Sequence, residues 1–301
     1  MDDRGLKRYR CFVVFLLIGI FLPLCPILPP APLFASRLSS PWLSFSPQRR
    51  YRGSAILATF RGPIHVVPKS IQWKDVTFPF FKTPKGTYQS LLAVPLSVRH
   101  KRLFFHLNAV EGKKSIRTGF ALMLYKKRFP TRAIYIKKRI RLDEETLARI
   151  EREKVELKTI FHHTRPLRLW EGTFIKPVPG GVTSRFGVRR KINGNYLSIH
   201  RGVDFRASMG TPVHAINSGK VVLEKELVLS GKTIVIDHGM GLYSLYGHLS
   251  KFRVNGGDKI RKNQVIGLSG KSGRATGPHL HLGVILQGIA IDPLSLFRLP
   301  L

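Results

Sequence analysis

Glycine recurs at short intervals through the C-terminal part of the chain, and this spacing limits what the segment can fold into. The runs between the glycines are β-prone and too short for long helices. Such a density of turns predicts an antiparallel, β-rich domain with little helix over residues 170–301. The glycines are Gly180, Gly187, Gly202, Gly210, Gly219, Gly231, Gly241, Gly257, Gly267 and Gly273.

Two histidines, His279 and His281, stand two residues apart inside the run Gly277–Gly283. Side chains at i and i+2 of a strand point to the same face, roughly 7 Å apart. Two imidazoles on one face can share a metal ion, or divide the work between a ligand and a proton-transfer group. Taken alone the spacing is a weak signal, because most such pairs have no functional role.

Two upstream segments strengthen the metal hypothesis. His200 and Asp204 are four residues apart, so a strand would place them on one face as well. Imidazole nitrogen and carboxylate oxygen are both ordinary zinc ligands. A third histidine, His248, lies in the Tyr-rich, β-prone run 243–250. Three protein ligands with an open fourth position are typical of catalytic zinc.

Taken together, these segments resemble the lysostaphin/LytM-type zinc metalloendopeptidases, which cut the peptide part of bacterial peptidoglycan. The resemblance covers roughly 177–297 and implies a catalytic domain like the duplicated hybrid motif, a β-sheet groove with the metal on its floor. It includes four further segments in the same order, which are 210–213, 219–222, 256–258 and 267–270.

The resemblance also assigns the site residues. Carried over residue by residue, it implies zinc ligands at His200, Asp204 and His281, and non-ligand catalytic histidines at His248 and His279. None of these positions is substituted. The chain has no H-E-x-x-H motif, so a histidine would have to take the proton. The sequence does not divide that task between His248 and His279.

Two functions remain open at this point. The first is a zinc-dependent endopeptidase that hydrolyses peptide cross-links of bacterial peptidoglycan. The second is a non-catalytic, cell-wall-binding activator of another hydrolase. Relatives of the second kind typically lose metal or catalytic residues, so the intact set favours the enzyme. Neither the cross-link that is cut nor the oligomeric state follows from the sequence.

The chain is strongly basic, with 51 Lys and Arg against 17 Asp and Glu and a formal net charge of +34. The excess is heavier in the first 170 residues, at +23, than in the rest, at +11. Such a charge favours an anionic wall or membrane surface as a partner, although a merely basic, solvated surface explains it equally well. No nucleic-acid-binding motif accompanies the charge, so no nucleic acid is expected.

The N-terminus, residues 1–35, is expected to be a signal peptide or a membrane anchor. A basic stretch precedes an apolar run from Cys11 to Leu22, and the chain has no cysteine besides Cys11 and Cys25. Leu33 makes a cut after Ala35 unfavourable, which favours the uncleaved anchor. Either alternative exports the rest of the chain to the periplasm or cell envelope.

The remaining segments complete a mainly β architecture. Residues 36–52 are rich in Ser, Pro and Arg and are interpreted as a linker. Residues 53–141 contain short β-prone runs that predict an immunoglobulin-like β-sandwich. Residues 142–169 are expected to form a connecting helix and linker, with Asp143 as N-cap and an end near Thr159. The β-prone runs are Ser54–Phe60, Ile64–Val67, Thr77–Phe81, Tyr88–Val94, Leu103–Leu107, Gly119–Tyr125 and Ala133–Ile136.

Overall fold

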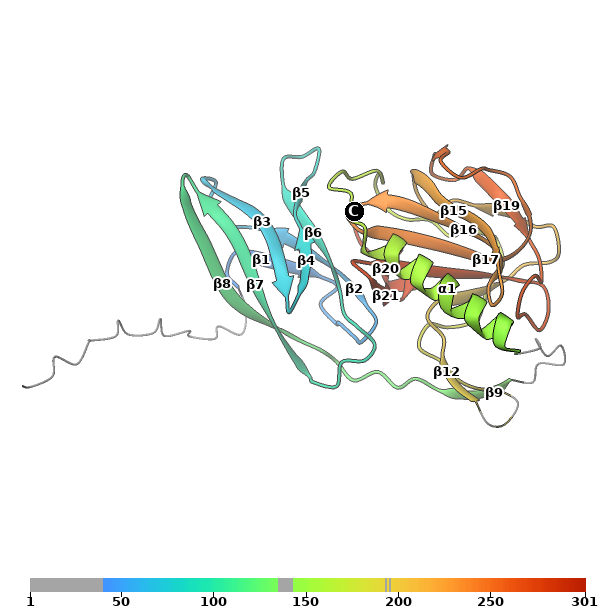
Figure 1. Ribbon diagram of the computed structural model, residues 1–301. Coiled ribbons are helices and arrows are strands. Elements are labelled where there is room, and N and C mark those ends of the chain that lie inside the picture. The colour runs from blue at the N-terminus through green and yellow to red at the C-terminus, as the bar shows by residue number, and fades with distance from the viewer. Residues whose placement is uncertain (1–39, 135–142, 193, 195) are drawn as a thin grey trace, which may run out of the picture. The chain divides into compact units, whose positions relative to one another are not determined.

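Two four-stranded antiparallel sheets are formed by the first part of the chain (Figure 1). The computed structural model describes residues 40–134 and 143–301, apart from 193 and 195. In spatial order, the first sheet contains β1 (Leu43–Ser46), β2 (Ala55–Phe60), β6 (Tyr88–Ala93) and β5 (Phe81–Lys82). The second contains β4 (Val76–Pro79), β3 (Val66–Trp73), β7 (Arg102–Glu111) and β8 (Lys114–Met123).

Both sheets bury one face in a common hydrophobic cluster. Leu57 and Leu92 come from the first sheet and Ile71 and Phe105 from the second, and all four side chains are buried. In β7 the alternation of buried and exposed residues follows the period of two that a half-buried strand requires. The expected antiparallel β architecture is confirmed, while the immunoglobulin-like topology stays a prediction.

Two strands depart from the expected arrangement, one by its position and one by its pairing. β1 falls inside the segment 36–52 and pairs with β2, because Leu43 and Phe45 are two residues apart and face inward among polar neighbours. β9 (Thr131–Ile134) does not join either of these sheets. It pairs in parallel with β11 (Arg189–Ile192), which also pairs with β12 (Tyr196–Ile199) in a separate three-stranded sheet.

A ten-stranded sheet dominates the C-terminal part, as the glycine spacing predicts. Its main path runs β10 (Val182–Ser184), β13 (Val203–Arg206), β20 (His279–Leu286), β17 (Leu242–Phe252), β16 (Gly231–Gly239), β15 (Gly219–Leu227) and β18 (Lys259–Ile260). β14 (Pro212–His214), β19 (Val265–Ser269) and β21 (Ile289–Ile291) pair at its sides, and the four-residue helix α2 (Pro293–Leu296) follows.

The two faces of strand β20 have different environments. Leu280 and Leu282 point into the main hydrophobic cluster and are fully buried. His279 and His281 lie on the opposite face, together with Ile285 farther along the strand. Ile285 belongs to a second, smaller hydrophobic cluster that includes Tyr243 of β17. One face of the sheet is therefore core, and the other is divided between histidines and a small apolar patch.

Helix α1 (Glu144–His162) covers that apolar patch. Its start is as predicted, because the Asp143 side chain accepts a hydrogen bond from the Thr146 amide. The helix extends beyond Thr159 because Ile160 and Phe161 pack against the patch. Neither helix of the described residues is long and apolar enough to cross a membrane. The signal or anchor expected at residues 1–35 lies outside the described part of the chain.

Candidate metal centre and active site

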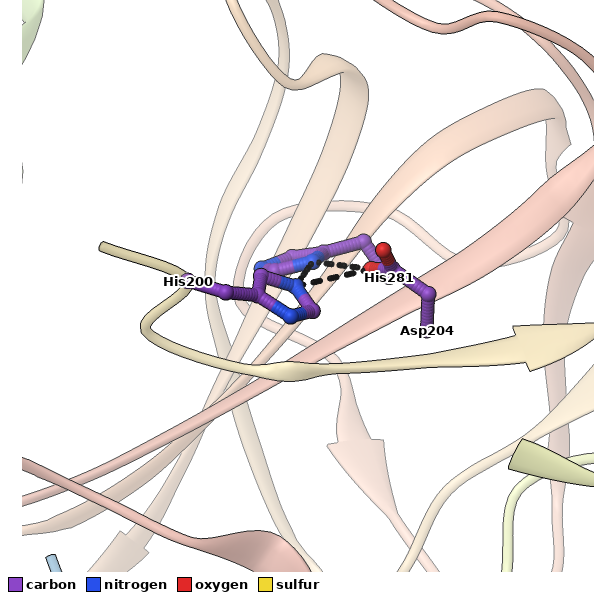
Figure 2. Close-up of side chains that lie close together, drawn as sticks. All are labelled: His200, Asp204 and His281. Atoms are coloured by element: carbon purple, nitrogen blue, oxygen red, sulfur yellow. Dashed lines mark hydrogen bonds and ion pairs between the residues drawn. The ribbon is translucent and has the colours of Figure 1, made fainter. Parts of the chain in front are cut away.

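Three donor side chains, His200, Asp204 and His281, converge on one point (Figure 2). His200 Nε2 lies 2.9 Å from Asp204 Oδ1, and His281 Nδ1 lies 2.8 Å from the same oxygen. The two imidazole nitrogens are 3.1 Å apart. His200 is 3% exposed and Asp204 is 7% exposed, so this polar cluster is largely removed from water.

Strand register brings these residues together. Asp204 in β13 pairs directly with His281 in β20, and His281 in turn pairs with Gly247 in β17. His200 follows β12, and its backbone N–H donates to the Val188 carbonyl at 2.9 Å. Gly202, between His200 and Asp204, leaves room for the His281 ring: a Cβ there would lie 2.5 Å from His281 Cε1.

The protons at this cluster can be counted. His200 Nδ1 faces the Arg185 carbonyl at 3.0 Å, and because a carbonyl only accepts, that nitrogen carries the proton. A neutral His200 therefore presents a lone pair at Nε2 toward the carboxylate of Asp204. His200 Nε2, Asp204 Oδ1 and His281 Nδ1 lie within about 3 Å of one another. Lone pairs on these atoms repel one another unless a cation or an additional proton lies between them.

The donor set fits zinc, for which two imidazole nitrogens and one carboxylate oxygen are ordinary ligands. Burial alone would raise the pKa of Asp204, but its close contacts with the His200 and His281 rings outweigh burial and hold the pKa far below its usual range. The carboxylate is thus ionised and able to hold a cation. Burial lowers the pKa of His200, although the Asp204 carboxylate opposes the shift. A neutral imidazole is the form that coordinates metal.

Arg190 of β11 contacts the other carboxylate oxygen of Asp204. Its Nη2 donates to Asp204 Oδ2 at 2.5 Å and lies 3.2 Å from Ser184 Oγ. Oδ2 is therefore occupied, and Oδ1 alone faces the two histidines. Hydrogen bonds of this kind fix the orientation of a ligand carboxylate. No local spacing in the sequence points to Arg190, because its contact with Asp204 depends on the placement of β11.

The two remaining histidines, His248 and His279, lie beside the cluster with their ring centroids 4.7 Å apart. His248 Nδ1 faces the Ser272 carbonyl and His279 Nδ1 faces the Gly277 carbonyl, each at 2.8 Å. Since carbonyls only accept, both Nδ1 atoms are protonated, and in the neutral rings both Nε2 atoms carry lone pairs. Each neutral ring thus presents Nε2 as the atom that can take up a proton and afterwards pass it on.

His248 has an unusual backbone and an unusual pKa. Its φ is +62°, in the left-handed region that non-glycine residues seldom adopt. Strain of this kind costs about 1–3 kcal/mol and clusters at functional sites. Burial, together with the neighbouring His281 and His279, lowers the pKa of His248 to about 3, so the ring is neutral near pH 7. The Gly247–His248 sequence would have suggested glycine as the left-handed residue.

All five predicted site residues line one cavity of about 310 Å³. A second cavity of about 420 Å³ adjoins it and shares Arg190, Asp204, Thr276 and His279. Another buried histidine, His238, lies apart from the site: its Nδ1 faces the Ser218 carbonyl and its Nε2 faces Ser244 Oγ. His238 is thus part of the core hydrogen bonding.

Comparison with known proteins identifies the same region. Residues 198–293 match peptidase family M23. The peptidoglycan DD-endopeptidase ShyA of Vibrio cholerae is 42% identical over 96 residues, which cover 32% of this chain and 22% of that protein. The DD-carboxypeptidase/endopeptidase Mpg of Neisseria meningitidis is 36% identical over 114 residues, or 38% of this chain and 26% of that protein.

A solved structure, described as a peptidase M23 from Pseudomonas aeruginosa, is similar over more of the chain. It is 27% identical with a TM-score of 0.65, and the match covers 83% of this chain and 95% of that one. The match to the two curated relatives spans only about a quarter of their length. The fold of the C-terminal part is therefore the M23 peptidase fold.

Proposed function

Residues 198–293 belong to peptidase family M23, and from this membership we propose that the protein is a zinc-dependent endopeptidase that hydrolyses peptide cross-links of bacterial peptidoglycan. The observation that carries the proposal is the convergence of two imidazole nitrogens and one carboxylate oxygen, with two further histidines in the same cavity. A non-catalytic wall-binding activator is not favoured, since every position expected of the enzyme is present.

In this proposal His200, Asp204 and His281 hold the metal. Zinc held by these residues supplies Lewis-acid polarisation of the scissile carbonyl and a strong local positive charge. The buried Asp204 keeps Oδ1 toward His200 and His281 because Arg190 occupies Oδ2. The small exposed fraction of the cluster excludes bulk water and so strengthens its electrostatic effect on a bound substrate.

His248 is assigned the role of proton acceptor. Its Nε2 carries a lone pair at neutral pH, while the hydrogen bond from Nδ1 to Ser272 fixes the orientation of the ring. His279 is assigned the transfer of a proton to the leaving amine. Its Nε2 lies 4.0 Å from Asp204 Oδ1, so a proton on this nitrogen has a carboxylate nearby. General acid–base groups of this kind contribute about 10²–10⁴-fold to rate.

The proposed substrate requires an extracytoplasmic location. We infer export to the cell envelope, because peptidoglycan lies outside the cytoplasmic membrane and the N-terminal 35 residues have the composition of a signal or anchor. Cell fractionation with intact-mass analysis tests this location. A membrane-bound protein with its original N-terminus supports an anchor, and a soluble form beginning near Ser36 supports a cleaved signal. A purely cytoplasmic protein would contradict the proposal.

Activity and metal content are tested together on the purified full-length protein. Cross-linked muropeptides of defined structure are digested, and the product masses identify the bond that is cut. The variant His281→Ala should lose both zinc and cleavage. His163→Ala is a matched control because its side chain is exposed and its hydrogen bonds are made by the backbone: the N–H donates to the Ile160 carbonyl, and the carbonyl accepts from the Tyr243 hydroxyl. Full zinc content in His281→Ala would refute the ligand assignment.

A further inference from the structure

The two cavities beside the candidate site form a groove with an unusual charge. The first is lined by Arg190, Arg201 and Arg274, and the second by Arg132, Arg190 and Arg206. In the described part of the chain, Asp204 is the one acidic residue in either lining, and it already contacts two histidines and Arg190. The groove therefore presents an uncompensated positive charge.

The type of cation in the groove also differs from the rest of the domain. From Glu171 to the C-terminus the chain contains nine arginines and nine lysines. All the cationic side chains that line the two cavities are arginines. The planar guanidinium group presents paired N–H donors that match both oxygens of a carboxylate, whereas the ammonium group of lysine acts as a point charge. The groove is thus suited to oxyanions that accept two parallel N–H bonds, and in a peptide substrate these are carboxylates.

Three of these guanidinium groups are available to a ligand. Among the described residues, no hydrogen bond or ion pair holds the side chains of Arg201, Arg206 and Arg274. Arg132 donates to the Thr183 carbonyl at 3.3 Å, and Arg190 donates to Asp204. Arg201 and Arg274 line the cavity that also holds all the predicted ligands and catalytic histidines. A carboxylate bound by these two side chains would lie near the scissile amide.

We propose that Arg201 and Arg274 form a subsite for a free carboxylate next to the scissile amide, with Arg206 of the adjoining cavity as a second contact. This inference rests on the proposed function and narrows its substrate class. Cross-links with free carboxylates on the residues that flank the cut bond should be preferred over neutral bridges such as oligoglycine. The carboxylate can belong to a side chain or to a chain terminus, and the experiment distinguishes the two sources.

The test uses the full-length protein and cross-linked peptides that differ only at their carboxylates. One peptide has all carboxylates free, one has only the side-chain carboxylate amidated, one only the terminal carboxylate, and one has both amidated. The wild type should cleave the free peptide with a kcat/KM on the order of 10- to 100-fold higher than the doubly amidated one. The singly amidated peptide with the larger loss identifies the source of the carboxylate.

Two double variants separate the subsite from general attraction between a basic protein and an anionic peptide. Arg201→Gln with Arg274→Gln should reduce the preference for the free peptide to near one. Arg253→Gln with Arg261→Gln removes the same charge from exposed positions outside both cavities and should retain the preference. The single variant Arg274→Gln, distant in sequence from His200, should lose part of the preference.

A binding measurement on the metal-free protein removes any contribution of zinc. Isothermal titration calorimetry after chelation should give a lower Kd for the free peptide than for the amidated one, and the Arg201/Arg274 variant should bind both equally. Cleavage of all the peptides at equal rates by the wild type overturns the subsite while the proposed function stands. Cleavage of none, in zinc-loaded protein, overturns the proposed function and the subsite with it.

Discussion

Substitution of Gly202 by alanine should disable the metal centre although it replaces none of the three donor residues. Gly202 lies under the edge of the His281 ring. A Cβ at this position would lie 2.5 Å from His281 Cε1 and 2.7 Å from His281 Nε2. It would also lie 2.5 Å from the carbonyl oxygen of Leu282 in strand β20, which cannot move without disturbing the strand.

The size of the effect follows from these distances. Carbon atoms pack at about 3.5–4.0 Å, so the ring must retreat by roughly 1 Å. A displacement of that size in a catalytic centre costs on the order of 10²-fold in rate. The forced packing should also lower the free energy of unfolding by about 1–3 kcal/mol. We therefore expect Gly202→Ala to fold with a reduced Tm, to bind zinc weakly and to lose most of its cleavage activity.

The assay combines zinc analysis after dialysis, thermal unfolding and kcat/KM on a cross-linked peptide. Gly256→Ala is the matched control, because its Cβ would meet nothing within 4 Å and its φ is ordinary. The control should retain zinc, Tm and activity. Zinc content and kcat/KM equal to those of the wild type in Gly202→Ala would refute the reasoning. A variant that does not unfold cooperatively would be recognised by its melting curve.

Three further outcomes are expected. His248→Ala should lose cleavage by on the order of 10²-fold or more yet retain zinc, and loss of the metal would contradict its assigned role. Burial lowers the pKa of His238 to about 4, so the unfolded chain binds a proton that the folded chain refuses. Stability should therefore fall as the pH falls from about 6.5 to about 4. In urea titrations at several pH values, the free energy of unfolding of His238→Gln should depend less steeply on pH than that of the wild type. An equal pH dependence in the two proteins would exclude His238 as the cause. Glu153→Ala removes a buried carboxylate and leaves the partly buried Val228 amide without its acceptor, which should cost about 1–3 kcal/mol in the same titrations. Glu156→Ala, at an exposed ion pair, should cost little.

The parts of the site that depend on local spacing could be predicted from the sequence. The pair His279 and His281 and the pair His200 and Asp204 follow from strand periodicity, and the resemblance to known endopeptidases joined them with His248. The start of helix α1 could likewise be predicted, because Asp143 is a favourable N-cap residue. These features are encoded within a few neighbouring residues.

The parts that depend on distant pairing could not be predicted. Arg190 reaches Asp204 only because β11 pairs with both β9 and β12, and no motif in the sequence specifies that arrangement. The left-handed backbone of His248 could not be predicted either, because Gly247 would be the expected residue for a positive φ. Strand β1 was missed since its two apolar residues stand among serines, prolines and arginines.

The direct pairing of Asp204 with His281 has a consequence for how this sequence can vary in length. Successive residues of a strand face opposite sides, so deletion of one residue within β13 or β20 would turn a donor from the groove toward the core. Insertions or deletions of one residue in these two strands should therefore abolish metal binding even where every histidine is kept. At the exposed turn of Gly256 and Gly257, where an added Cβ meets nothing within 4 Å, gain or loss of residues leaves the pairing unchanged.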